Sequence, residues 1–192
     1  MPLLIETIKI ENGKLANLSY HQARFDKSRK DLFAVTKRID LSTVINAPKS
    51  GLYRCRILYN EDIRSIKYIP YKEKDITKLK VVPSDIDYAY KYADREIFTK
   101  LLQEYSAYDE IIIEKEDYVT DTTISNIAFY DGEKWLTPGH PLLPGTMRAK
   151  LLDEGFLHKK EIRKENLKNY SQIALMNSMI GFKILNDFTI EQ

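Results

Sequence analysis

The sequence predicts an α+β fold built from two small subdomains. Short runs with apolar residues at every second position recur along the chain, and turn pairs such as Asn12-Gly13 follow several of them. A few amphipathic helical segments lie among these strand-like runs. A charged stretch over residues 71–77 contains no apolar cluster, so we place the boundary there. The predicted subdomains span residues 1–74 and 78–192.

The first subdomain is predicted to open with a hairpin whose strands span residues 3–10 and 14–18. Ser19 then follows as a suitable N-cap for an amphipathic helix. In that helix His21 and Arg24 are three positions apart, so we expect their side chains to share one face.

Further along, residues 41–47 predict a short second helix, and residues 51–59 and 63–70 predict two strands. The two-residue period of the strand at 51–59 separates Arg54 and Arg56 from its more apolar positions. The two arginine side chains are therefore expected to point the same way.

The second subdomain is predicted to combine strands with helices at its edges. Asp94 is a suitable cap for a helix with Ile97, Phe98, Leu101, Leu102 and Tyr105 on its buried stripe. Pro144-Gly145 predicts a turn entering another helix, which ends near Gly155, and a third short helix is expected at 165–170. The predicted strands are residues 78–83, 85–91, 109–114, 118–130, 159–162, 172–176 and 182–185.

Composition excludes several functions. There are 30 basic and 28 acidic residues, so the formal charge of +2 gives no sign of a dedicated nucleic-acid or membrane surface. The apolar runs are too short to cross a bilayer, and the first residues lack the basic start of a signal peptide, so we expect a cytoplasmic protein. The single Cys55 excludes an intrachain disulfide, and three scattered histidines make a metal site improbable.

The motifs of the second subdomain resemble those of a known enzyme family. They read Val119-Thr-Asp121, Ser125-Asn-Ile127 and Leu143-Pro-Gly-Thr-Met-Arg148, with Lys91 upstream. This combination resembles the class IV aminotransferases, the fold-type IV enzymes that use pyridoxal 5′-phosphate. The resemblance implies a D-amino acid aminotransferase-like fold with the site between its two subdomains, and a homodimer as the working form.

The resemblance also assigns a role to each candidate residue. Lys91 corresponds to the lysine that forms the Schiff base with the cofactor, and a strand lysine flanked by tyrosines could be desolvated enough to act as an amine. Asp121 stands where most members have glutamate, and its carboxylate would keep the pyridine nitrogen protonated. A solvent-facing strand lysine and a strand-edge acid are the structural alternatives.

The cofactor's phosphate is expected among five residues at three places in the chain. Arg24 lies in His21-Gln-Ala-Arg24, which resembles the family's phosphate-gripping His-x-x-Arg element. Gly145 would allow close backbone approach at a helix start, where the N–H groups of Thr146 and Met147 favour an anion. Ser178 would close the cradle with its hydroxyl. A surface salt bridge for Arg24 and a plain turn at Ser178 are the alternatives.

The reaction is left open between two chemistries that begin alike. Arg54, Arg56 and Tyr90 are tentative binders of substrate carboxylates, the alternative being an exposed basic strand face. The opening Ile5-Glu6-Thr7 and the Asn177-Ser-x-x-Gly181 ending resemble the branch that converts 4-amino-4-deoxychorismate to 4-aminobenzoate and pyruvate. The other reading is an aminotransferase for branched-chain or D-amino acids. A protein that keeps the fold without catalysis is a third alternative, which the intact Lys91 disfavours.

Overall fold

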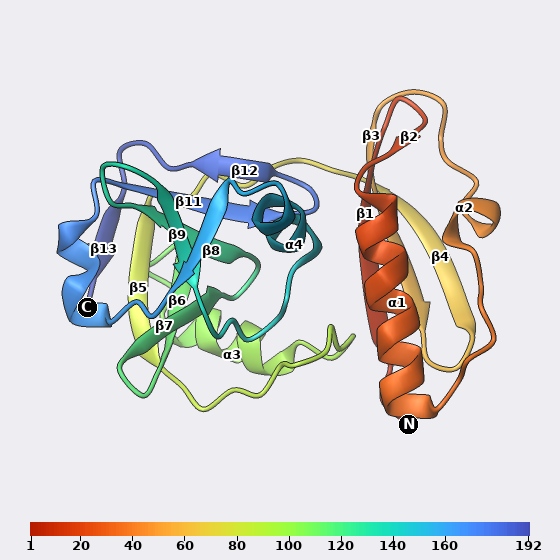
Figure 1. Cartoon of the computed structure of the whole chain (residues 1–192), viewed down its shortest axis with the longest axis horizontal. Helices are drawn as coiled ribbons and strands as arrows, with labels where there is room; N and C mark the ends of the chain where they lie inside the picture. Colours follow the sequence, from red (N-terminus) through yellow and green to blue (C-terminus); the bar gives the residue numbers. More distant parts are fainter. The chain divides into compact units, whose positions relative to one another are not determined.

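The computed structural model describes all residues from 1 to 192 and divides the chain into two compact units (Figure 1). Unit 1 comprises Met1–Glu73 and Tyr90–Asp94, and unit 2 comprises Lys74–Ala89 and Arg95–Gln192. The division between Glu73 and Lys74 lies within the charged stretch 71–77, from which a boundary was predicted.

The short segment Tyr90–Asp94 belongs to unit 1 because its backbone pairs with strand β1 (Leu4–Glu11). The Ile5 amide donates to the Lys91 carbonyl at 2.9 Å, and Leu4 and Tyr92 form an isolated antiparallel bridge. The predicted strand over residues 85–91 is therefore wrong. An alternating pattern is present there, but no neighbouring strand runs alongside it to complete a ladder.

Unit 1 contains one antiparallel sheet with the strand order β2-β1-β3-β4. The other strands are β2 (Lys14–Leu15), β3 (Leu52–Tyr59) and β4 (Ile63–Pro70). All of them were predicted, but β2 is shorter than the predicted strand over residues 14–18. In the register between β1 and β3, Lys9 lies opposite Arg54 and Thr7 lies opposite Arg56. On β4, Lys67 lies opposite Arg56.

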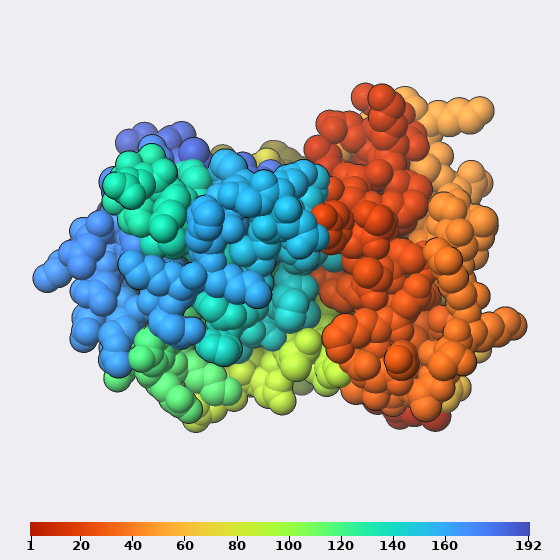
Figure 2. All heavy atoms as spheres, viewed as in Figure 1, coloured from red at the N-terminus to blue at the C-terminus, as the bar shows by residue number.

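Helix α1 (Leu18–Phe33) packs on one face of this sheet, and its side chains cover β1 in the space-filling view (Figure 2). Its cap is Asn17, in the left-handed conformation with φ 52°, and no side chain caps the first turn. The prediction that Ser19 caps the helix is therefore wrong. Helix α2 (Leu41–Val44) ends three residues earlier than predicted, and the Asp40 carboxylate caps it by accepting from Ser42 N.

Alternation along β3 confirms the predicted faces of that strand. Cys55, Ile57 and Tyr59 are buried with Phe25 in the core beneath α1. Arg54 and Arg56 lie on the opposite face, and both are half-buried.

Unit 2 contains two sheets. One has the order β13-β5-β6-β7, with strands β5 (Lys78–Pro83), β6 (Glu110–Lys115), β7 (Tyr118–Thr122) and β13 (Thr189–Glu191). The other has the order β10-β9-β8-β11-β12, with strands β8 (Asn126–Tyr130), β9 (Trp135–Pro138), β10 (Leu157–Lys160), β11 (Gln172–Asn177) and β12 (Gly181–Ile184). The run 118–130, predicted as strand, passes from one sheet to the other through a turn at 123–125.

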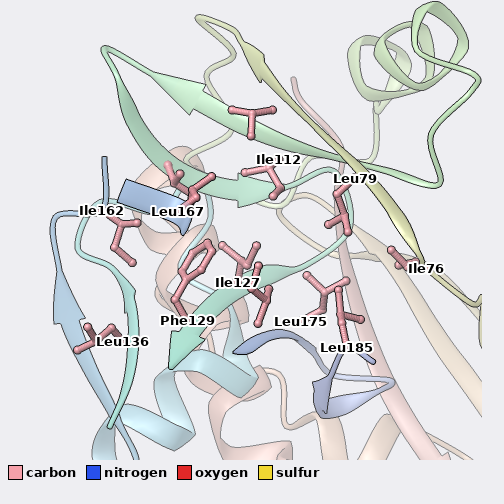
Figure 3. Packing of buried hydrophobic residues seen from close by; sticks show 13 residues of the cluster. Ile76, Leu79, Ile112, Ile127, Phe129, Leu136, Ile162, Leu167, Leu175 and Leu185 are labelled. Carbon is pink, nitrogen blue, oxygen red and sulfur yellow. The ribbon is translucent and has the colours of Figure 1, made fainter. Parts of the chain in front are cut away.

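The hydrophobic core of unit 2 lies between these sheets (Figure 3). Leu79 and Ile112 come from the first sheet, and Ile127, Phe129 and Leu175 come from the second. All five side chains are fully buried, so the β7–β8 turn that joins the two sheets is held on both sides by packed strands.

The helices of unit 2 are α3 (Glu96–Glu104), α4 (Thr146–Asp153) and the 3-10 helix η1 (Lys164–Asn169). Arg95, not Asp94, is the N-cap of α3, and of its predicted buried stripe only Phe98 is buried, while Ile97 is 52% exposed. Gly155, with φ 71°, follows the end of α4 as expected.

Candidate active site

In unit 1 a buried carboxylate, Glu6, joins β1 to α1. The Arg24 guanidinium donates from Nε to Oε1 at 2.8 Å and from Nη2 to Oε2 at 2.7 Å. The His21 ring lies with Nδ1 2.7 Å from Glu6 Oε2. His21 and Arg24 thus share one helix face, as predicted, and both contact the same acid.

The charges of this cluster are balanced inside the protein. Burial alone would raise the pKa of Glu6, but the Arg24 charge and the hydrogen bonds from Arg24 and His21 lower the pKa to about 2. Burial lowers the pKa of His21, against the opposing effect of Glu6. A neutral His21 that donates through Nδ1–H to ionised Glu6 satisfies both groups.

Lys91 is not on a strand, but its position is fixed by its backbone. Its carbonyl accepts from Ile5 N, and the flanking Ala93 amide donates to Leu3 O at 2.8 Å. The side chain is half-buried rather than fully exposed to solvent, and its charge is one of those that lower the pKa of His21. Lys91 and Arg24 therefore both belong to unit 1 and are both anchored to β1.

In unit 2 the carboxylate of Asp121 is buried at the end of β7 and accepts two hydrogen bonds. Asn126 Nδ2 donates to Oδ1 at 2.6 Å, and Leu143 N donates to Oδ2 at 2.9 Å. Burial raises the pKa of Asp121 to about 7, although these hydrogen bonds and the charge of Arg148 lower it. Asp121 is therefore an acid that changes protonation near neutral pH.

Gly145 precedes α4 in an ordinary extended conformation, with φ −71° and ψ 147°. A Cβ at this position would lie 2.0 Å from Asn126 Oδ1, closer than any side chain can tolerate. The first hydrogen bond of the helix runs from Ala149 N to Gly145 O at 2.9 Å, so Thr146 and Met147 lie in the first turn. Glycine is required here to make room for Asn126, a reason that the sequence pattern did not indicate.

Ser178 lies in the turn between β11 and β12, where a predicted turn is confirmed. The preceding Asn177 reaches the β7–β8 turn, donating from Nδ2 to Ser125 Oγ at 3.2 Å and to Ile124 O at 3.4 Å. The Asn177 Oδ1 also accepts from Met179 N at 2.8 Å. Asn177 thus ties the turn that carries Ser178 to the turn that follows Asp121.

The tentative substrate residues differ in their surroundings. The Nε of Arg54 is buried without a hydrogen-bond partner, and neither Arg54 nor Arg56 takes part in an ion pair. Tyr90 Oη, by contrast, donates to Asp31 at 3.1 Å. Arg54 and Arg56 are therefore open to an anion, whereas the Tyr90 hydroxyl already has a partner within unit 1.

The predicted residues fall into two groups, one in each unit. Unit 1 carries Arg24, Lys91, Arg54, Arg56 and Tyr90, and unit 2 carries Asp121, Gly145, Thr146, Met147 and Ser178. Sequence reasoning gave no role to Glu6 or Asn126. A glutamate at an inward position of β1 is a signal that could have identified Glu6, since a buried carboxylate needs cationic partners.

Two negative findings complete the description. The chain has no helix that combines the length and the apolar composition needed to span a membrane. No group of three or more histidine, cysteine, aspartate or glutamate side chains is arranged to hold a metal ion.

Comparison with known proteins places these features in a family. Residues 3–184 match the amino-transferase class IV family. An uncharacterized protein of Haemophilus influenzae is 39% identical over 184 residues, covering 93% of this chain and 98% of the relative. The two proteins are therefore similar over nearly their whole lengths.

Two solved structures are similar over almost their whole length. A candidate 4-amino-4-deoxychorismate lyase from Haemophilus somnus is 39% identical with a TM-score of 0.86, covering 94% of this chain and 98% of that one. A candidate amino-acid aminotransferase from Mesorhizobium loti is 25% identical with a TM-score of 0.82, covering 98% and 99%. The mixed α/β architecture matches the fold-type IV aminotransferases, and the chain is an enzyme that belongs to the class IV aminotransferase family.

Proposed function

We propose that this enzyme is a pyridoxal-phosphate-dependent lyase that converts 4-amino-4-deoxychorismate to 4-aminobenzoate and pyruvate. The Haemophilus somnus structure supports this choice, as does a candidate aminodeoxychorismate lyase of Schizosaccharomyces pombe that is 32% identical over 140 residues. The product 4-aminobenzoate is a precursor for folate synthesis.

The residues of the chain fit the proposed cofactor by their chemistry. Asp121 is a buried acid whose oxygens face hydrogen-bond donors, and such an acid suits a protonated ring nitrogen. Arg24, which Glu6 holds through Nε and Nη2, offers a fixed positive charge, and the first turn of α4 offers backbone N–H groups, both of which suit a phosphate. When bound, the cofactor supplies an electron sink for the carbanion formed at the substrate carbon that carries nitrogen.

Each residue then has a defined task. Lys91 Nζ would hold the cofactor covalently, and its free amine would take the proton from the substrate carbon that carries nitrogen. Asp121 would supply the carboxylate that stabilises a protonated ring nitrogen. Arg24, Thr146, Met147 and Ser178 would bind the phosphate and so set the orientation of the ring.

The observation that most directly supports the lyase substrate is the pair of arginines on β3. Arg54 and Arg56 share the sheet face opposite α1, and neither has an acidic partner. Lys9 and Lys67 face them across the neighbouring strands, and because Lys9 pairs with Glu11, the excess positive charge of this face comes from Arg54, Arg56 and Lys67. A substrate with two carboxylates, such as 4-amino-4-deoxychorismate, would supply two negative charges to two guanidinium groups.

The alternative is an aminotransferase that acts on branched-chain or D-amino acids. Similarity to the Mesorhizobium loti structure favours it. The two reactions differ in their need for a second substrate, because a transaminase requires a keto acid to complete its cycle and the lyase does not.

The test is an assay of purified protein with 4-amino-4-deoxychorismate and no keto acid. Continuous release of 4-aminobenzoate supports the lyase, whereas a stall after one half-reaction supports the aminotransferase. Lys91→Ala should abolish turnover. Lys100→Ala is the matched control, because Lys100 is an exposed lysine of α3 that pairs with Glu96 on the same helix.

We also propose that the enzyme acts in the cytoplasm as a homodimer. Sedimentation of the purified protein and fractionation of cells would test these two points separately from the reaction.

A further inference from the structure

We infer that Asn126 is the positioning residue of the active site: it clamps the Asp121 carboxylate to the loop that leads into α4. This inference rests on the proposed function only in taking Asp121 as the acid that faces the cofactor's ring nitrogen. The clamp itself is a property of unit 2.

The two amide N–H groups of Asn126 have separate partners. Nδ2 donates to Asp121 Oδ1 at 2.6 Å and to the Leu143 carbonyl at 2.8 Å. Leu143 in turn donates its backbone N–H to Asp121 Oδ2 at 2.9 Å. These three hydrogen bonds form a closed ring that joins Asp121, Asn126 and Leu143. Asn126 and Asp121 are both buried.

The orientation of the amide follows from its partners. Both atoms that Nδ2 contacts are acceptors, so the amide must present its NH2 group to them and its oxygen elsewhere. That oxygen points at Gly145, where a Cβ would lie 2.0 Å away. One side chain therefore bonds to the acid and lies against the residue from which α4 begins.

The clamp has a chemical consequence for the acid. Hydrogen bonds to a carboxylate favour its charged form, and the Asn126 bond is one of the interactions that oppose burial at Asp121. A hydrogen bond to a charged group contributes roughly 1.5–3 kcal/mol, which corresponds to about tenfold to hundredfold in proton affinity. Asn126 therefore keeps Asp121 ionised at a pH where burial alone would protonate it.

The experiment follows the Asp121 carboxyl by carbon-13 NMR during a pH titration of the full-length protein. In the Asn126→Ala variant the Asp121 carboxylate should bind its proton about tenfold or more tightly than in the wild type. Asn126→Leu should act in the same direction, because leucine has a similar shape and lacks both N–H donors. Thr120→Val is the matched control: it removes a buried hydroxyl on β7 that bonds to Ile113 O and does not touch Asp121.

A second variant, Gly145→Ala, tests the clamp without changing Asn126. It should displace Asn126 and strengthen proton binding at Asp121 by itself, and where Asn126→Ala folds, Gly145→Ala should have little further effect in that background. The inference is overturned if Asn126→Ala shifts the Asp121 titration no more than Thr120→Val does. Equal effects of Gly145→Ala in both backgrounds would also overturn it.

Adding pyridoxal phosphate separates this inference from the proposed function. If the titration shifts as expected but the protein binds no cofactor, the clamp stands and the proposed function fails. If the cofactor binds while the titration is unchanged by Asn126→Ala, the proposed function stands and the clamp is refuted.

Discussion

Replacing Glu6 by glutamine is expected to destabilise unit 1 by about 3 kcal/mol at pH 7 and by much less near pH 2. Glu6 is fully buried and receives two hydrogen bonds from Arg24 and one from His21. Glutamine preserves the shape but removes the charge, and its NH2 group would face donors that now lack an acceptor.

The magnitude follows from the protonation of the acid. Its pKa falls from 4.5 to about 2 on folding, and each unit corresponds to ~1.4 kcal/mol, so ionised Glu6 contributes about 3 kcal/mol. Because the pKa is lowered in the folded state, this contribution is complete above pH 4.5. It is lost as the pH falls toward 2.

The assay is urea unfolding at a series of pH values between 7 and 2, followed by circular dichroism. The sole tryptophan, Trp135, lies in unit 2, so hydrogen exchange of β1 and α1 peptides is needed to assign the change to unit 1. Glu11→Gln on the same strand is the matched control, because Glu11 forms only a partly exposed pair with Lys9. If the difference in free energy of unfolding between wild type and Glu6→Gln stays constant from pH 7 to pH 2, the stabilisation does not come from ionised Glu6.

Three further outcomes are expected. Without cofactor, the free energy of unfolding, followed by Trp135 fluorescence, should fall by about 4 kcal/mol as the pH rises from 4 to 7. The reason is that folding raises the pKa of Asp121 to about 7, so the buried acid is favourable only while it is protonated. This fall should be absent in Asp121→Asn. Arg56→Gln should raise KM for the dicarboxylate substrate about tenfold or more with little change in kcat, and an unchanged KM would remove Arg56 from the site. Ile112→Ala, in the core between the two sheets, should cost roughly 2–5 kcal/mol in urea unfolding, and a cost under about 1 kcal/mol would contradict the described packing.

Strands and motifs were largely predictable because they depend on local pattern. Alternation identified β3 and β4, and Asn12-Gly13 identified the hairpin. The family resemblance, carried by Lys91 and the motifs around Asp121, correctly indicated the enzyme class and the fold.

Contacts between residues distant in sequence were not predictable. Glu6 and Arg24 are 18 positions apart, and only the fold brings the carboxylate to the guanidinium. The segment 85–91 alternates like a strand, yet no strand pairs along it. Only its end meets β1, through the Ile5 N–H bond to Lys91 O and the isolated bridge between Leu4 and Tyr92, because pairing requires a neighbour that the local pattern cannot reveal.

Gly145 shows the same limit for a single residue. The motif suggested that glycine lets a phosphate approach the backbone, but the structure gives a second reason, the Asn126 oxygen 2.0 Å from any added Cβ. A spatial neighbour 19 positions away determines this requirement, and no local pattern contains it.

The proposed function is tested most directly by finding which amine of the protein binds the cofactor covalently. The protein would be incubated with pyridoxal phosphate, treated with borohydride to make the linkage permanent, digested and analysed by mass spectrometry. We expect one modified residue, Lys91, and no stoichiometric modification in Lys91→Ala. Labelling spread over several lysines, or confined to a lysine other than Lys91, would refute the proposed role of Lys91.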